Sequence, residues 1–330
     1  TFGYYKGGNM RKSILFLVVV ITSLFFGCED NLNPNGEYRE LYTVNCVLRC
    51  DTSVQYLTIT QAYQIMGNNP LDNKTDPFIK NAEVKIYYDD KVVVFRDTSI
   101  ARMDSSRYNS PLHYYYAKNF KPEEDKNYEI DILLPYGRRL NSKTKTPTTL
   151  EFIKQTSSLL VTKDIREQLS YFWKINNNDV VYVPRLTFYY YKTENGVKTK
   201  YKKQIPLRYE KRGSENVAVY PKPDKHPYVF YDISVVKKAF EEISEGDPYK
   251  GNYSIVSGTY FELIILDENL SAYYSTSNSA YGEFSVKIDE TDFSNISNGF
   301  GVFGSYMHQE IRVSFSEEFV NSFGYALVFN

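Results

Sequence analysis

The chain has 330 residues, of which 42% are hydrophobic and 24% are charged, so it can bury a core, and intrinsic disorder is excluded. Its formal net charge of −1 argues against a dedicated nucleic-acid binder, and its three cysteines are too few for a disulfide scaffold or a four-cysteine zinc site. Aromatic residues make up 16% of the chain, mainly 32 tyrosines and 21 phenylalanines, which favours β-sheet with partly exposed faces.

The first 27 residues predict a targeting signal. A short basic start at Met10-Arg11-Lys12 is followed by an uncharged apolar run over residues 13–26 and then by Gly27-Cys28. The apolar run is too short to cross a bilayer comfortably, because a spanning helix needs about 20 residues. A basic start and a short apolar run before a small residue are typical of a secretory signal peptide.

The cysteine after that small residue narrows the prediction, because the pattern resembles the lipobox of bacterial lipoproteins. Phe25 departs from the motif, which prefers leucine there, and a buried helix that ends in a cysteine is the alternative. We expect residues 1–9 to lie upstream of the initiator methionine and the signal peptide to end at Gly27. Cys28 is then the lipidated first residue of an outer-membrane protein that faces the periplasm or the cell surface.

The mature chain begins with a predicted tether over residues 28–40, which are polar and contain Pro34 and Gly36. Residues 41–149 then alternate apolar and polar side chains in short segments separated by turn signals, which predicts an antiparallel β-sandwich. Cys46 and Cys50 are four residues apart in the first strand, or roughly 13 Å, which is too far for a disulfide. We therefore expect two free thiols.

Residues 150–330 predict a second β-rich domain with short helices. Asn195-Gly196 is a type I′ turn signal between two long strands. Asp232 can cap a helix over about residues 232–245, and the apolar run at residues 260–266 predicts a strand buried on both faces. The other elements expected here are a short helix at 267–277 and strands at 283–288, 311–315 and 325–329.

The sequence contains no pattern typical of a catalytic, metal or cofactor site. His113, His226 and His308 lie far apart, and the acidic clusters fall at predicted turns and helix starts, where solvation and capping favour acids. The oxygen-rich segment 68–76 could hold Ca²⁺, but it lacks the EF-hand spacing and a closing glutamate, so a plain loop is the alternative. We expect no enzyme activity, no cofactor and no metal.

Charge is most uneven at residues 192–212, where eight basic residues accompany only Glu194 and Glu210 and follow three tyrosines at 189–191. A cationic, tyrosine-rich edge could meet phosphorylated lipid or acidic glycan, because clustered charge raises local affinity. Alternatively, the lysines could protect an edge strand against aggregation.

A glycine-rich segment at residues 299–304 is the second candidate contact surface. We expect a loop that presents Phe300, Phe303 and Tyr306 to a partner, because loops on a rigid sandwich often carry recognition and aromatic residues are frequent at interface hot spots. The alternative is that the rings pack under the sandwich as part of the core.

Several segments together resemble a known family, the Bacteroidota outer-membrane lipoproteins that carry the domain of unknown function number 4249. The matching features are the signal with Cys28, the strand Ala82-Glu83-Val84-Lys85-Ile86, the strand at 128–134, the turn Tyr136-Gly137-Arg138, the strand at 142–147, Tyr171-Phe172-Trp173-Lys174 and the segment 294–304. The resemblance implies an immunoglobulin- or transthyretin-like first domain, a second β-rich domain and association with TonB-dependent receptors. It implies no established activity and no catalytic residues.

These observations predict a membrane-anchored, non-catalytic binding or accessory module, in keeping with a TonB-dependent uptake system. Its expected partners are the membrane, through the lipid on Cys28, and a TonB-dependent receptor or a surface glycan, but not nucleic acid. The alternatives are a surface adhesin or structural lipoprotein and, as a third class, a glycan-active enzyme.

Overall fold

The computed structural model describes residues 40–62, 76–106, 108, 110–165, 167–175, 180–278 and 293–329, which all belong to one compact unit. Several predicted features lie outside these residues. They are the signal peptide, Cys28, all of the tether except Glu40, the oxygen-rich segment up to residue 75 and the strand expected at 283–288.

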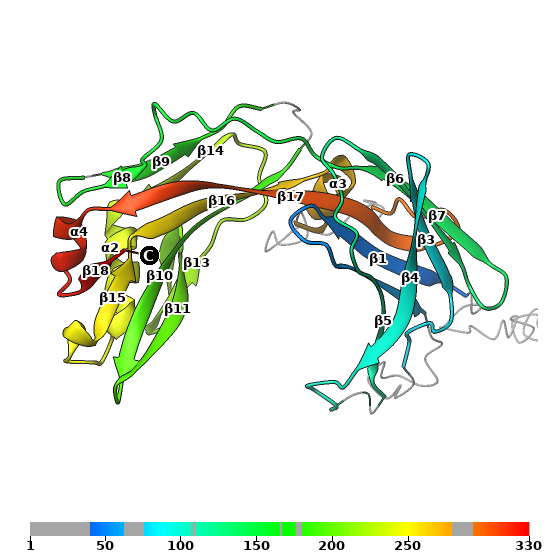
Figure 1. Cartoon of the computed structure of the whole chain (residues 1–330), viewed down its shortest axis with the longest axis horizontal. Helices are drawn as coiled ribbons and strands as arrows, with labels where there is room; N and C mark the ends of the chain where they lie inside the picture. Colours follow the sequence, from blue (N-terminus) through cyan, green and yellow to red (C-terminus); the bar gives the residue numbers. More distant parts are fainter. Residues whose placement is uncertain are drawn as a thin grey trace, which may run out of the picture. The chain divides into compact units, whose positions relative to one another are not determined.

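The described chain is mainly β with a few short helices, which confirms the predicted fold class (Figure 1). The strands before residue 150 are β1 (Tyr42–Arg49), β2 (Gln55–Gln61), β3 (Glu83–Tyr88), β4 (Lys91–Ile100), β5 (Leu112–Ala117), β6 (Asn127–Leu133) and β7 (Arg139–Lys145). Each of β1, β3 and β6 buries every second side chain, as their alternating sequences predict.

The later strands alternate with short helices. The strands are β8 (Leu160–Val161), β9 (Gln168–Phe172), β10 (Tyr182–Glu194), β11 (Val197–Ile205), β12 (Arg208–Arg212), β13 (Glu215–Val219), β14 (Tyr228–Asp232), β15 (Tyr253–Val256), β16 (Gly258–Leu266), β17 (Phe300–Phe315) and β18 (Ala326–Val328). The helices are α2 (Ile233–Glu241), α3 (Glu268–Asn278) and α4 (Glu317–Asn321), with 3-10 turns η2 (Glu242–Ser244) and η3 (Lys250–Asn252).

Most of the predicted local elements after residue 150 are confirmed. Asn195 and Gly196 adopt positive φ angles of 50° and 79° in the turn between β10 and β11, as a type I′ hairpin requires. Asp232 caps α2 by accepting a hydrogen bond from the Ser234 backbone N–H at 2.7 Å. β16 buries residues on both faces, because Phe261, Leu263 and Ile265 pack in the large aromatic core while Leu266 packs in a smaller cluster with Leu270 and Val302.

Fourteen of the described strands form one mixed sheet, and β17 holds its two halves together. The strand order is β18-β15-β10-β16-β17-β1-β2-β5-β4-β3-β6-β7, with β11 beside β10 and β8 beside β17. The first half of β17 pairs in parallel with β1, and its second half pairs antiparallel with β16. The strand therefore changes partner at Tyr306, which is in register with Arg49 of β1 and with Leu266 of β16.

Two main cores lie along this sheet. The first contains inward side chains of β1, β2 and β5 on one side and of β3, β6 and β7 on the other, together with Ile296 and Phe303. The second is rich in aromatic rings and packs α2 and α4 on the sheet, with Phe188 stacked on Phe240 at 4.3 Å. The immunoglobulin- or transthyretin-like topology and the division near residue 150 stay predictions.

Tyrosine is a core residue here as well as a surface residue, which composition alone did not indicate. Tyr42, Tyr115, Tyr128, Tyr171, Tyr182, Tyr231 and Tyr253 are nearly or fully buried. Some of the buried hydroxyls find partners, since Tyr115 donates to the Ile79 carbonyl at 3.0 Å and Tyr128 accepts from the Glu123 N–H at 2.8 Å, whereas those of Tyr171 and Tyr182 have none among the described residues. Within the described part of the chain, no helix is both long and apolar enough to cross a membrane.

Candidate functional site

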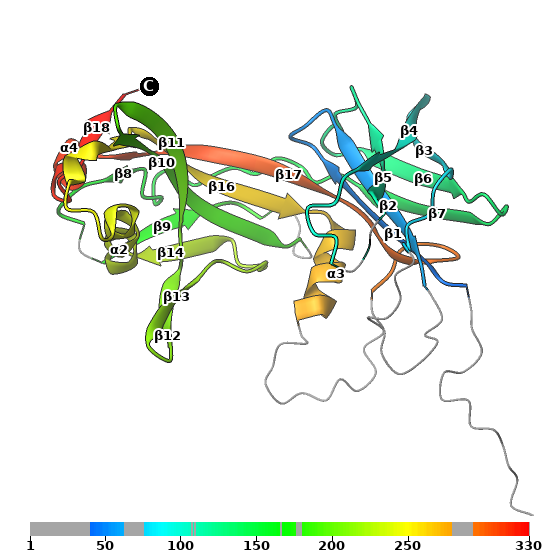
Figure 2. The ribbon, with the colours of Figure 1, turned by 90° about the horizontal axis from the view of Figure 1, so that it is seen from below.

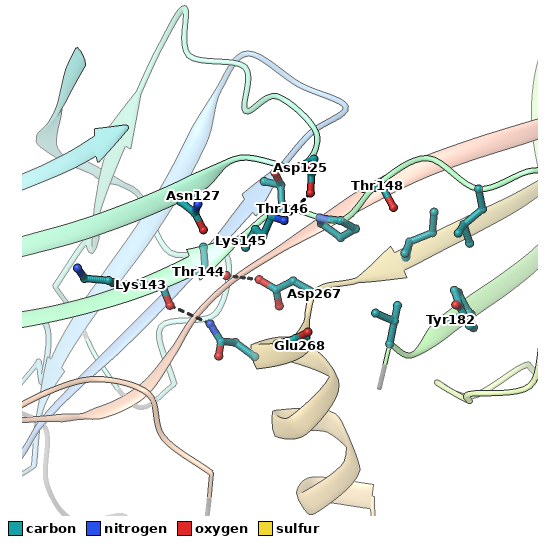
Figure 3. Close-up of a pocket in the computed structure, with 15 residues that line it drawn as sticks. Asp125, Asn127, Lys143, Thr144, Lys145, Thr146, Thr148, Tyr182, Asp267 and Glu268 are labelled. Atoms are coloured by element: carbon teal, nitrogen blue, oxygen red, sulfur yellow. Dashed lines mark hydrogen bonds and ion pairs between the residues drawn. The ribbon is translucent and has the colours of Figure 1, made fainter. Parts of the chain in front are cut away.

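A polar cavity of about 540 Å³ opens where β7 approaches the end of β16 and the start of α3 (Figure 3). Its polar wall carries Asp125, Asn127, Lys143, Lys145, Thr146 and Asn269, and its apolar wall carries Leu150, Val180 and Ile265. The volume is within the range of small-molecule sites. The mixture of ammonium, carboxylate, amide and hydroxyl groups suits a polar ligand better than an apolar one.

Asp267 lies at the floor of the cavity, between the end of β16 and the start of α3 (Figure 3). It links β16 to α3, and its side chain caps the helix by accepting a 2.7 Å hydrogen bond from the Leu270 N–H. Its second carboxylate oxygen accepts hydrogen bonds from the hydroxyls of Thr144 on β7 and Ser305 on β17. One carboxylate thus ties together β7, β17 and α3, which are distant in the sequence.

Burial is the main influence on the pKa of the Asp267 carboxyl group. The residue is only 3% exposed, and loss of solvation raises the pKa of its carboxyl to about 6, although the donated hydrogen bonds oppose this shift. Both carboxylate oxygens already accept hydrogen bonds within the protein, so the carboxylate stabilises the fold and has no unpartnered oxygen to offer a ligand. We therefore assign it a positioning role.

The start of α3 is fixed to the same strands by a second side chain. Asn269 donates from Nδ2 to the Lys143 carbonyl at 2.9 Å and to the Phe303 carbonyl at 3.2 Å. Figure 2 shows α3 beside the part of β17 that passes from β16 to β1. The floor of the cavity is therefore held by hydrogen bonds from Asp267 and Asn269 at the start of α3.

The rim of the cavity is charged and more exposed. Lys145 pairs with Asp125 at 2.6 Å, and Lys143 pairs with Glu129 at 2.9 Å. Asn127 is the direct cross-strand partner of Lys145. These exposed groups can exchange their partners for a ligand at low cost, because surface ion pairs contribute little to stability.

The predicted glycine loop at residues 299–304 is wrong as a loop, because Phe300 already begins β17. Phe303 is fully buried in the first core and cannot reach a partner. Phe300 is 49% exposed, whereas Tyr306 is half-buried with the Arg49 guanidinium 5.7 Å from its ring centre. The three residues therefore do not form one contact surface, and the alternative that a ring packs inside is correct for Phe303.

The segment before β17 has a structural explanation. The Asn295 amide accepts from the Phe303 N–H at 2.9 Å and donates to the Phe303 carbonyl at 2.7 Å, so it takes the place of a neighbouring strand. A side chain at Gly301 would meet the Val44 carbonyl oxygen at 2.1 Å, and one at Gly304 would meet Leu270. The glycines therefore allow β17 to approach β1 and α3.

The remaining candidates from the sequence are the cysteines and the histidines. Cys46 and Cys50 are free thiols, as predicted, and burial raises the pKa of Cys50 to about 12. His113 lies on β5 beside Asp97, and His226 lies in the loop before β14 beside Asp224. Among the described residues there is no group of three or more His, Cys, Asp or Glu side chains placed to share a metal ion.

Sequence reasoning missed the cavity because its wall is assembled from β6, β7, β16 and α3. Asp267 carried one usable signal, since an aspartate directly before a predicted helix at 267–277 is typical of a cap. Nothing local indicated that Thr144, 123 residues earlier, would share its carboxylate. The lysines at 192–203 lie on the β10–β11 hairpin, whereas Lys211 lies on β12, which pairs with β13.

The family model described as Domain of unknown function (DUF4249) matches residues 29–312. No curated protein matches the chain.

Proposed function

The chain belongs to the family of the domain of unknown function DUF4249, and we propose that it is a lipid-anchored, non-catalytic binding module of the bacterial outer membrane. We propose further that it serves as an accessory protein of a TonB-dependent uptake system. The anchor is Cys28, which the basic start, the apolar run and Gly27 before it support.

The polar cavity is the observation that carries the binding role. Its floor is set by Asp267 and Asn269 at the start of α3, which form hydrogen bonds to β7 and β17, so its shape is fixed before any ligand arrives. Its rim presents Asn127, Lys145 and Asp125. A preorganised floor lowers the cost of ordering the site, and rim groups of both charges supply donors and acceptors. We propose a small polar ligand that is bound without chemical change.

Native mass spectrometry of the full-length protein, purified from detergent-solubilised membranes, tests this role. We expect a bound small molecule on the wild type that is lost from the Asn127→Leu/Lys145→Met variant, because that variant removes an amide and an ammonium from the rim. The matched control is Asn216→Leu/Lys163→Met, which removes the same groups from exposed positions outside the cavity wall.

The control variant should keep the bound species. A wild type without any bound small molecule would contradict ligand binding at the cavity. Equal retention of the small molecule by the rim variant and the control would show that it binds at another part of the protein.

A further inference from the structure

A row of lysines follows the free edge of the β10–β11 hairpin. Lys198, Lys200 and Lys202 alternate along β11, so their side chains share one face, and all three are exposed. Among the described strands β11 pairs with β10 alone, which makes it an edge. The row spans roughly 13 Å, because four residues of a strand rise about 3.3 Å each.

Tyrosine rings of the neighbouring strand hold these lysines in place. In the register of the hairpin, Tyr191 faces Lys200 and Tyr189 faces Lys202. The Lys198 ammonium lies 4.2 Å from the Tyr191 ring centre, and the Lys200 ammonium lies 4.8 Å from the Tyr189 ring centre. Contacts of this kind restrict the long side chains without neutralising their charge.

The charge of the row is mostly uncompensated. Lys202 pairs with Glu262 at 3.3 Å, whereas Lys198 and Lys200 have no acidic partner among the described residues. Glu194 at the tip of the hairpin pairs with Lys192 instead. Lys198 and Lys200 therefore present two adjacent ammonium groups without an acidic partner in the described part of the chain, and Glu194 with Lys192 lies on the other face of the hairpin.

We propose that this lysine row binds a linear acidic polysaccharide, whose successive carboxylate or sulfate groups meet Lys200 and Lys198. A narrow row of charge complements an extended polymer, and the tyrosine contacts reduce the ordering cost of binding. A membrane surface would fit less well, because a plane of headgroups is matched by positive charge spread in two directions, whereas Lys198, Lys200 and Lys202 form a single line along β11. Protection of the edge alone needs only charge and does not need lysines ordered on rings.

The lysine row lies on β11, which contributes no residue to the cavity wall, so this inference does not depend on the proposed function. The experiment measures binding of the full-length protein, in detergent, to polygalacturonate and to dextran sulfate, with neutral dextran as the uncharged reference. Carboxylate and sulfate polymers are the two possible sources of the anion, and the stronger binder identifies which one the row prefers.

The test variant is Lys198→Gln/Lys200→Gln, and the matched control is Lys154→Gln/Lys163→Gln, which removes two exposed lysines elsewhere. We expect the test variant to bind the acidic polymers about tenfold more weakly, since two ion contacts are lost, while the control stays within about twofold of the wild type. A thermal melt of each variant verifies that it is folded. Added salt should weaken wild-type binding.

Equal weakening in both double variants would overturn the proposal, and so would binding of neutral dextran with the same affinity. Vesicles that contain phosphatidylglycerol provide the membrane alternative. All variants carry the same lipid anchor, so the anchor contributes equally to their vesicle binding. If only the test variant lost vesicle binding while its polysaccharide binding stayed unchanged, the lysine row would be a membrane-binding site and not a polysaccharide site.

Discussion

Gly301 shows how a single missing side chain allows two distant strands to pair. Its φ of 101° disfavours other residues, and an added Cβ would lie 2.1 Å from the Val44 carbonyl oxygen. Gly137 also has a positive φ, of 85°, but nothing lies within 4 Å of its missing Cβ. An alanine at Gly137 would therefore meet backbone strain alone, whereas an alanine at Gly301 would meet both backbone strain and steric overlap.

We expect Gly301→Ala to lower the free energy of unfolding by about 3 kcal/mol or more, because strain and overlap add. Gly137→Ala should cost only about 1 kcal/mol, the strain alone. Chemical denaturation of both variants measures the difference. Similar losses would show that the close approach of β17 to β1 is not what requires glycine.

Asp267 makes stability depend on pH. Its folded pKa of about 6 exceeds the unfolded value of 3.8, so the folded state holds the proton to higher pH than the unfolded state does. Stability is therefore lost as the pH rises from about 4 to about 6, by about 1.4 kcal/mol for each unit between the two pKa values. Above this window the loss is complete and constant.

The Asp267→Asn variant provides the comparison, since asparagine also caps helices but does not titrate. We expect the unfolding free energy of the wild type, minus that of the variant, to decrease between pH 4 and pH 6 and to stay level up to pH 8. Denaturant titrations over this range measure it. A difference that grows with pH would mean that the carboxylate is stabilised in its charged form.

At the scale of the element, β17 is organised by its change of partner. Where β17 pairs with β1, the Asn295 amide satisfies the Phe303 N–H on the other edge. Where it pairs with β16, the Gln309 side chain takes both backbone groups of Leu150. The Asn295 amide thus replaces a strand neighbour of β17 at Phe303, and the Gln309 amide ties β17 to the backbone of Leu150.

Asn295→Leu removes that replacement, so we expect a loss of about 1–3 kcal/mol from the unsatisfied Phe303 N–H. The matched variant is Asn295→Asp, which keeps an acceptor for the N–H and loses only the donor to a carbonyl that Asn269 also serves. Hydrogen exchange of the Phe303 amide should accelerate in the leucine variant and much less in the aspartate variant. Unchanged protection in both would show that the amide is dispensable.

Elements could be predicted from the sequence where their signals are local. Alternation identified β1, β3 and β6, and caps or turns identified α2 and the β10–β11 hairpin. Of the 16-residue strand β17, only residues 311–315 were predicted, because the glycines at its start are turn signals on their own. Gly301 is explained by β1, which lies more than 250 residues earlier, and Gly304 by Leu270 of α3. The cavity was missed for the same reason, since its wall is non-local.

At the scale of the whole molecule, the predicted anchor at Cys28 is independent of the described fold. We expect metabolic labelling with a fatty-acid analogue to tag the wild type and not Cys28→Ala, because only the thiol can carry the lipid. The abundance of both proteins on a blot is the control. Equal labelling would contradict the lipobox interpretation of residues 10–28.

We propose that the protein works as an accessory binding module of an uptake complex. Affinity purification from detergent-solubilised outer membranes, followed by mass spectrometry, tests this role. We expect a TonB-dependent receptor to co-purify with the wild type and to be lost with Cys28→Ala. The contradicting result is that no receptor co-purifies while cells lacking the protein lose attachment, which would establish a surface adhesin instead.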